Sequence, residues 1–401
     1  MTTGGETPST LRPEARLVLA CARTHLDDEQ KAAIASLAAR GLDWNAAIDL
    51  AEAHSVMPLL YTSLRLSAPD AVPADAMGRL QSLFYSNSLR NFALRDELLR
   101  ILRELQSRGI QAVPYKGPVL AENVYDDLSL RKFGDLDILA RREQIPEAAQ
   151  ALRALGYALE GSRRVPDSAH YQMTHHHVFH RAEGDVYVEL HWEIADPFFA
   201  APALAAGFWD RVTTARLGGV EVPGIPPEDG LLFLCVHHTA EEWGRLTQIC
   251  DIAEIVRAAP VMDWDFLRGE ARRLGVSRML RLGLRLACTL LQARLPDAVL
   301  AEVESDSVAV RLASAVQERL FDPSARPVRS ADLARISRFR LAARERLRDK
   351  ARYSLAAAFL PSLDDWEWVS LPERFYGLYF LLRPVRMLAK YLHCGKRADH
   401  V

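Results

Sequence analysis

The chain has 401 residues, of which 49% are apolar and 25% are charged, a composition typical of globular proteins that excludes general disorder. The formal net charge of −2 gives no indication of a nucleic-acid-binding protein. The five cysteines are odd in number, widely spaced and without a CxxC pair, which argues against a disulfide framework and a structural zinc site.

Apolar runs in the sequence are short. None approaches the ~20 residues that a membrane-spanning helix needs, and the N-terminus lacks an apolar signal core. Together with the cysteine pattern, which fits a reducing compartment, these features predict a cytoplasmic protein without a transmembrane segment. Only residues 1–10 have the composition of a flexible tail.

The N-terminal part is predicted to be helical, with alanine-rich stretches interrupted by prolines. A further helix is indicated where leucines recur at steps of three and four over residues 94–105, with Gly109 as its stop signal. Residues 110–115 are short and partly β-branched, which favours a strand. Residues 118–125 are predicted to form a short helix.

Strand and helix signals then alternate. Residues 135–139 alternate polar and apolar side chains, as a half-buried strand does, and residues 146–155 form a helix with proline in its first turn. Residues 177–192 are typical of two strands around a turn at 182–185. After about residue 225 only helical patterns remain.

These elements predict an α+β protein in which a mixed sheet with flanking helices lies between N-terminal helices and a helical C-terminal domain. The expected organisation is a tail at 1–10, a helical region at 11–94, the α/β core at 95–222 and a helical domain at 223–401.

Asp135 and Asp137 are the first candidate site residues. In a strand they project from one face, while Leu136 and Ile138 face the core. Two carboxylates held close together favour a cation between them, and Mg²⁺ suits a few carboxylates combined with substrate phosphates. A solvated strand end is the structural alternative.

A third carboxylate, Glu189, is expected on the strand that begins at Val186. Its neighbour His191 shares that strand face, whereas the intervening apolar residues share the other. Burial of Glu189 without a partner would cost several kcal/mol, so a metal or another cation is expected beside it. His191 is predicted either to orient the acceptor, ligate metal or assist proton transfer, or simply to satisfy a buried neighbour.

Lys116 and Gly117 lie between a predicted strand and a predicted helix. Backbone N–H groups at a helix start, with a glycine that allows close approach, can hold a phosphate. Lys116 adds a point charge, and Arg131 lies four residues before Asp135, within reach of the same phosphates. Lys116 or Arg131, taken alone, is also typical of a basic residue on the protein surface.

Two further groups allow alternative interpretations. Consecutive histidines in a strand alternate faces, so in the run 175–177 at most His175 and His177 are expected to be able to share an ion. A loop cluster with one residue facing the active site is the favoured alternative. One of His237 and His238, on an apolar helix, is expected in the core. The segment 335–352 carries eight Lys/Arg residues and two acids, which predicts a solvated helical face or a docking site for an anionic or peptide substrate.

Several segments, taken in order, carry a family resemblance. They are Lys116-Gly117-x-x-Leu120, Arg131-x-x-Gly134-Asp135-x-Asp137-Ile138-Leu139, Glu189-Leu190-His191-Trp192, Leu234-Cys235-Val236-His237, Trp243-x-Arg245-Leu246, Asp251-Ile252, Leu371-Pro372, Leu378-Tyr379 and Leu382-Arg383-Pro384. Over roughly residues 90–390 the chain resembles a bacterial family of uncharacterised nucleotidyltransferases, within the polymerase-β-like nucleotidyltransferase superfamily.

The resemblance implies a mixed sheet flanked by helices and two Mg²⁺ ions, with Mn²⁺ as an alternative ion. Asp135 and Asp137 would bridge the metals, and Glu189 would hold the ion that activates the acceptor. The residues assigned to the NTP donor are Lys116, Gly117, Arg131 and Gly134. Lys116 and Gly117 stand where the wider superfamily has a Gly-Ser pair, and Glu241 stands where the family often has a second histidine.

Three functions compete. The leading hypothesis is metal-dependent transfer of a nucleotidyl group from an NTP to an acceptor that the sequence does not identify, whether a small molecule, a peptide or a protein. A DxD-dependent glycosyltransferase-like enzyme that uses a nucleotide sugar is the alternative from another enzyme class. A non-catalytic nucleotide-binding scaffold is the third. It is disfavoured because three carboxylates close together destabilise the protein, and a protein without catalysis has no reason to keep them.

Overall fold

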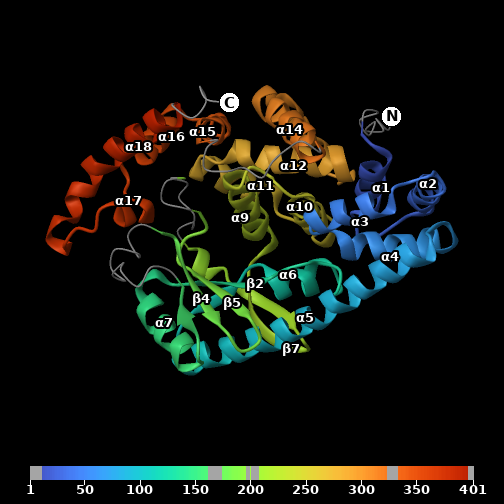
Figure 1. Ribbon diagram of the computed structural model, residues 1–401, viewed down its shortest axis with the longest axis horizontal. Helices are drawn as coiled ribbons and strands as arrows, with labels where there is room; N and C mark the ends of the chain where they lie inside the picture. Colours follow the sequence, from blue (N-terminus) through green and yellow to red (C-terminus); the bar gives the residue numbers. More distant parts are fainter. Residues whose placement is uncertain (1–10, 161–173, 196–198, 200–206, 323–332, 396–401) are drawn as a thin grey trace.

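A computed structural model describes residues 11–160, 174–195, 199, 207–322 and 333–395. The predicted tail at 1–10 lies outside these residues. Helices dominate both ends of the chain, and a five-stranded mixed sheet lies between them in sequence (Figure 1). The predicted α+β fold class is confirmed.

The N-terminal helices begin at residues that favour helix starts. The Asp27 and Asp43 side chains cap two of them, each by accepting a hydrogen bond from the backbone N–H three residues later. Pro13 and Pro58 stand in the first turns of the other two. The helices are α1 (Pro13–Cys21), α2 (Asp28–Ala38), α3 (Trp44–Ala53) and α4 (Met57–Ser67), with a short 3-10 turn, η1 (Pro69–Ala71), after them.

A long helix, α5 (Ala74–Ser107), links the N-terminal helices to the sheet (Figure 1). Its first turns bury Ala76 and Leu80 among the N-terminal helices, whereas its second half buries Leu94 to Leu105 beneath the sheet. The expected boundary at 94–95 therefore lies inside one continuous helix. Gly109 follows with φ 71, as expected for a residue that ends a helix.

The sheet has the strand order β1-β2-β5-β4-β3. Its central pair, β2 and β5, is parallel, and the other neighbours are antiparallel. The strands are β1 (Ala112–Pro114), β2 (Asp135–Ala140), β3 (Ala158–Leu159), β4 (His176–Arg181) and β5 (Val186–His191), and the helices between them are α6 (Gly117–Val124) and α7 (Ile145–Ala154). The strands and helices predicted from residue 110 to residue 192 are all present, with ends shifted by one or two residues.

The two faces of the sheet differ in chemistry. Leu136, Ile138, Val188 and Leu190 face α5 and α7 in a hydrophobic core, as the alternation predicted. The opposite face carries the polar residues of β2 and β5. Beside them Leu139 packs under the helix α9 (Pro227–Ala240) in a small apolar cluster. The carboxylates therefore stand on a sheet whose opposite face is packed in a hydrophobic core, with α9 beside them.

After β5 the chain forms a small hairpin, β6 (Thr213–Leu217) and β7 (Val220–Gly224), and then only helices among the described residues. Helices α9 to α14 share one continuous hydrophobic core with α1 to α4, so residues far apart in sequence pack together (Figure 1). These helices are α9 (Pro227–Ala240), α10 (Leu246–Ala258), α11 (Trp264–Leu274), α12 (Ser277–Leu291), α13 (Asp297–Ser305) and α14 (Ser307–Leu320).

The basic segment 335–352 is not one solvated helical face. It is divided between two helices, and Arg344 between them is buried, with its guanidinium 4.3 Å from the Phe199 ring centroid and 4.0 Å from that of Tyr353. Burial lowers the pKa of Arg344 to about 10. The C-terminal helices are α15 (Leu333–Ala342), α16 (Leu347–Phe359), α17 (Leu363–Trp368) and α18 (Tyr379–Gly395). No helix among the described residues has the length and apolar character that crossing a membrane requires.

Candidate active site

The three predicted carboxylates lie on the central strands of the sheet. In the parallel β2–β5 pair, Asp137 stands directly opposite Glu189, and Asp135 lies two residues earlier on the same face of β2. Carboxyl oxygens of Asp137 and Glu189 and a ring nitrogen of His191 all lie within 4.8 Å of one another. The strand alternation and the parallel register together bring these side chains to one place.

His191 is fully buried between the acids. Its Nε2 lies 3.1 Å from Glu189 Oε2 and 3.3 Å from Asp137 Oδ1, and the Tyr115 hydroxyl lies 3.3 Å from the same nitrogen. Burial alone would lower the pKa of His191, but hydrogen bonds to Asp137 and Glu189 raise it above its ordinary value. The ring therefore holds the two carboxylates together.

The two aspartates of β2 have opposite electrostatic environments. Burial, followed by repulsion from Asp137 and Glu189, raises the pKa of Asp135 to about 6. Burial would also raise the pKa of Asp137, but the Lys116 ammonium and a hydrogen bond from His191 bring it below its ordinary value. Asp137 has cationic partners in the protein, whereas the charge of Asp135 is only weakly compensated.

Lys116 reaches the same site from the end of β1. The Tyr115 N–H donates to the Asp137 carbonyl at 3.3 Å, so the antiparallel pairing brings the next residue beside the carboxylates. Lys116 Nζ lies 3.3 Å from Asp137 Oδ1. Gly117 begins α6 with φ 55, and a Cβ there would lie 3.4 Å from the Asp135 carbonyl oxygen. Glycine thus lets the start of α6 approach β2 closely.

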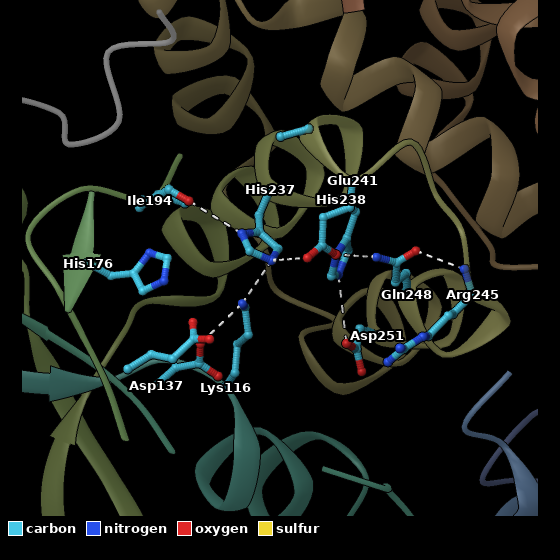
Figure 2. A network of polar contacts seen from close by, with 12 residues as sticks. Lys116, Asp137, His176, Ile194, His237, His238, Glu241, Arg245, Gln248 and Asp251 are labelled. Atoms are coloured by element: carbon cyan, nitrogen blue, oxygen red, sulfur yellow. Dashed lines mark hydrogen bonds and ion pairs between the residues drawn. The ribbon is translucent and has the colours of Figure 1, made fainter. Parts of the chain in front are cut away.

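Helix α9 contributes a residue that the sequence did not single out for the site. His237 Nε2 lies 2.9 Å from Lys116 Nζ and 3.3 Å from Glu241 Oε1, and its Nδ1 lies 3.3 Å from the Ile194 carbonyl (Figure 2). His237 therefore lies between Lys116 and Glu241 on one side and the Ile194 carbonyl on the other. The i, i+4 spacing of His237 and Glu241 was the available signal.

His238, the neighbour of His237, is the predicted core histidine. It is buried, its ring centroid lies 5.4 Å from that of Trp243, and burial lowers its pKa to about 4. The prediction that one histidine of this pair belongs to the core is confirmed.

Comparison with protein families gives one match. A family model described as an uncharacterised nucleotidyltransferase matches residues 40–292. The chain belongs to this family. The family resemblance inferred from the sequence is thereby confirmed as far as residue 292, whereas its C-terminal segments at 371–384 lie outside the match. The protein is a nucleotidyltransferase. Comparison with curated proteins and with solved structures gave no match.

The matched segment of this nucleotidyltransferase includes the carboxylates, Lys116 and His237. It also includes α3, α4 and α9 to α12, which bury a common core. Helices that precede the sheet in the sequence and helices that follow it are therefore part of the unit that the family model describes.

Arg131, predicted from its sequence position to contact the donor phosphates, pairs with a buried carboxylate. Its Nε and Nη2 each donate to the Asp251 carboxylate of α10 at 2.8 Å, and Asp251 also accepts from the Tyr125 hydroxyl at 2.6 Å. The arginine and the aspartate are both buried. The guanidinium thus has a partner 120 residues away in sequence, and its contact with the donor phosphates stays a prediction. Gly134, next to Asp135, is exposed, and its carbonyl lies 3.5 Å from Arg90 Nη2.

Replacing Arg131 with Met is expected to destabilise the fold by about 3–5 kcal/mol, because it leaves the Asp251 carboxylate buried without its cation. Urea unfolding measures the loss, with Arg216→Met at an exposed arginine as the control. Arg131→Met combined with Asp251→Leu should recover part of it. Normal stability of Arg131→Met together with weaker NTP binding would support the phosphate assignment.

The histidine run at 175–177 also differs from expectation. His175 and His176 lie on the side of His191, whereas the His177 ring packs in the opposite layer with its centroid 4.9 Å from that of Trp192. Alternation does not extend to His175, because this residue lies in a bend and β4 begins only at His176. The predicted pair of His175 and His177 on one face is therefore wrong.

Proposed function

We propose that the protein transfers a nucleotidyl group from an NTP to an acceptor, with divalent metal ions at Asp135, Asp137 and Glu189. The observation that carries the proposal is the placement of three carboxylates on adjacent parallel strands. The start of a helix and a lysine stand beside them. This combination suits a metal-bound triphosphate, and family membership supports the nucleotidyl chemistry.

The donor set fits hard divalent cations. Asp135 is raised in pKa by burial and by its acidic neighbours, which is the condition that a bound cation would relieve. Oxygen ligands from a few carboxylates, completed by substrate phosphates, are typical of Mg²⁺ sites, and Mn²⁺ accepts the same ligands. When bound, such ions would stabilise both the attacking and the leaving oxygens of an in-line displacement at the α-phosphate.

The residues of this chain have separable tasks in the proposal. Lys116 and the first N–H groups of α6 bind the phosphates. The Lys116 ammonium contacts both Asp137 and His237. The lysine therefore keeps His237 as a partner when Asp137 binds a metal ion. Glu189 would hold the ion on the acceptor side and take the acceptor's proton, with His191 fixing the Glu189 carboxylate in place.

The test supplies α-phosphate-labelled NTPs one at a time with Mg²⁺ and fractionated cell extract. The expected result is label in a new product together with pyrophosphate release. Turnover of nucleotide sugars without reaction of any NTP would instead support the glycosyltransferase-like alternative. Binding of NTP without transfer to any fraction would support the scaffold.

Lys116→Ala is expected to weaken NTP binding by about 1.5–3 kcal/mol, or about 10- to 150-fold in Kd, because a charge-assisted contact to phosphate is lost. Calorimetric titration with a non-hydrolysable NTP and saturating Mg²⁺ measures it. Lys132→Ala is the matched control, since Lys132 Nζ pairs with Glu52 Oε2 at 2.9 Å. Equal dissociation constants for Lys116→Ala and the unchanged protein would remove the lysine from the nucleotide site.

A further inference from the structure

Three histidines gather beside the carboxylates, on the same face of the sheet. His176 stands directly opposite His191 in the antiparallel β4–β5 pair, so both side chains project from that face. His175 joins them from the bend before β4. Figure 2 shows the His176 ring on the side of the sheet that carries Asp137 and Lys116.

The three rings are close enough to share one ion. Their centroids are 4.3 Å apart for His175 and His176, 4.9 Å for His176 and His191, and 5.6 Å for His175 and His191. One nitrogen from each ring lies within 4.8 Å of the others. His176 Nδ1 is 3.1 Å from His175 Nε2. Two imidazole nitrogens on a tetrahedral zinc ion are about 3.3 Å apart, since each Zn–N bond is about 2.0–2.1 Å.

We propose that His175, His176 and His191 form a binding site for a borderline-soft divalent ion of the Zn²⁺ class, next to the carboxylates but different in ligand type. Imidazole nitrogen binds Zn²⁺, Ni²⁺ and Co²⁺ well, whereas Mg²⁺ prefers oxygen. The site does not depend on the proposed nucleotidyl transfer, because its three ligands are histidines and not the carboxylates proposed to hold Mg²⁺.

Glu189 and Asp137 support the histidine site from behind. A metal-ligating histidine usually donates its second ring N–H to a carboxylate, which fixes its tautomer and makes it a stronger ligand. His191 Nε2 lies 3.1 Å from Glu189 and 3.3 Å from Asp137, so we assign the ion to Nδ1, which lies 3.4 Å from the Tyr115 hydroxyl. The same acids lower the electrostatic cost of a second positive ion nearby.

Cobalt titration tests the site on the full chain. Metal-free protein receives Co²⁺ in a large excess of Mg²⁺, which fills oxygen sites and competes poorly for imidazole. The expected result is one bound Co²⁺ whose visible absorption indicates nitrogen ligands and low coordination number. His175→Ala and His176→Ala are each expected to weaken this binding by at least about 100-fold, the upper end of the loss for a missing outer partner.

Two controls separate the possible results. His180→Ala, on the same strand face but stacked 4.3 Å from Tyr187, should bind Co²⁺ as the unchanged protein does. Asp135→Asn should lose Mg²⁺-dependent transfer yet keep the Co²⁺ spectrum, so the proposed function and the histidine site can fail independently. Circular dichroism confirms that each variant is folded. Absence of the nitrogen-ligand spectrum, or its persistence in folded His175→Ala and His176→Ala, overturns the proposal.

Discussion

Replacing either Asp135 or Asp137 with Asn is expected to abolish nucleotidyl transfer, but the two changes should move stability in opposite directions. Each variant loses one anchor of the proposed metal ions, and turnover should fall by about 10²–10³-fold or more, as when a preorganised group that stabilises transition-state charge is removed. Turnover is measured as pyrophosphate release at saturating NTP and Mg²⁺.

The opposite effects on stability follow from the different partners of the two acids. Asp135 is raised in pKa to about 6 by burial and by Asp137 and Glu189, so its ionised form costs stability at neutral pH and Asn removes that cost. Asp137 is lowered in pKa because Lys116 and His191 stabilise its charge, so Asn removes a favourable interaction. In chelator at pH 7–8, Asp135→Asn should therefore raise Tm and Asp137→Asn should lower it.

Asp185→Asn is the control for both measurements, since this carboxylate is exposed in the turn between β4 and β5. It should change neither turnover nor Tm appreciably. Normal turnover in Asp135→Asn or Asp137→Asn would exclude the DxD pair as the metal site. Equal Tm changes in the two variants would mean that Lys116 and His191 do not distinguish the two acids.

The carboxylates could be predicted because local geometry governs them. Alternation within a strand places Asp135 with Asp137 and Glu189 with His191, and it needs only the residues of that strand. The direct opposition of Asp137 and Glu189 requires the parallel register of β2 and β5, which local pattern does not specify. The family resemblance implied only that the three carboxylates hold the metal ions together.

Long-range contacts explain what the sequence missed. His237 lies 121 residues after Lys116, on a helix whose middle, residues 231–236, is a continuous apolar run, so nothing local indicates which side of α9 faces the sheet. Arg131 is close to Asp135 in sequence, yet Asp251 decides where its guanidinium points. His175 escaped the alternation rule because the strand begins one residue later.

The N-terminal helices are a further example of the same limit. Alanine-rich stretches correctly indicated helices before residue 94, and the loss of strand signals correctly indicated helices after residue 225. An apolar face predicts that a helix will be buried, but it does not identify the element against which the helix packs. The shared core of α1 to α4 with α9 to α14 is a property of the complete fold.

Glu189→Gln is expected to leave Mg²⁺-NTP affinity nearly unchanged and to reduce turnover by about 10²–10⁴-fold, the range for loss of a positioned proton acceptor. Glu189 contacts His191, whereas Lys116 contacts Asp137. The residues proposed to hold the triphosphate therefore keep their own partners. Glutamine has the same size and its amide oxygen can still accept from His191 Nε2, so the fold should be retained.

The comparison with Lys116→Ala makes this prediction specific. Calorimetry gives the NTP dissociation constant, and single-turnover kinetics gives the rate of transfer. Lys116→Ala should change mainly the former, and Glu189→Gln mainly the latter. A Glu189→Gln variant that loses NTP affinity as strongly as Lys116→Ala would place Glu189 on the donor side. In that case Asp135 and Asp137 alone would carry the metal, and the acceptor's proton would need another base.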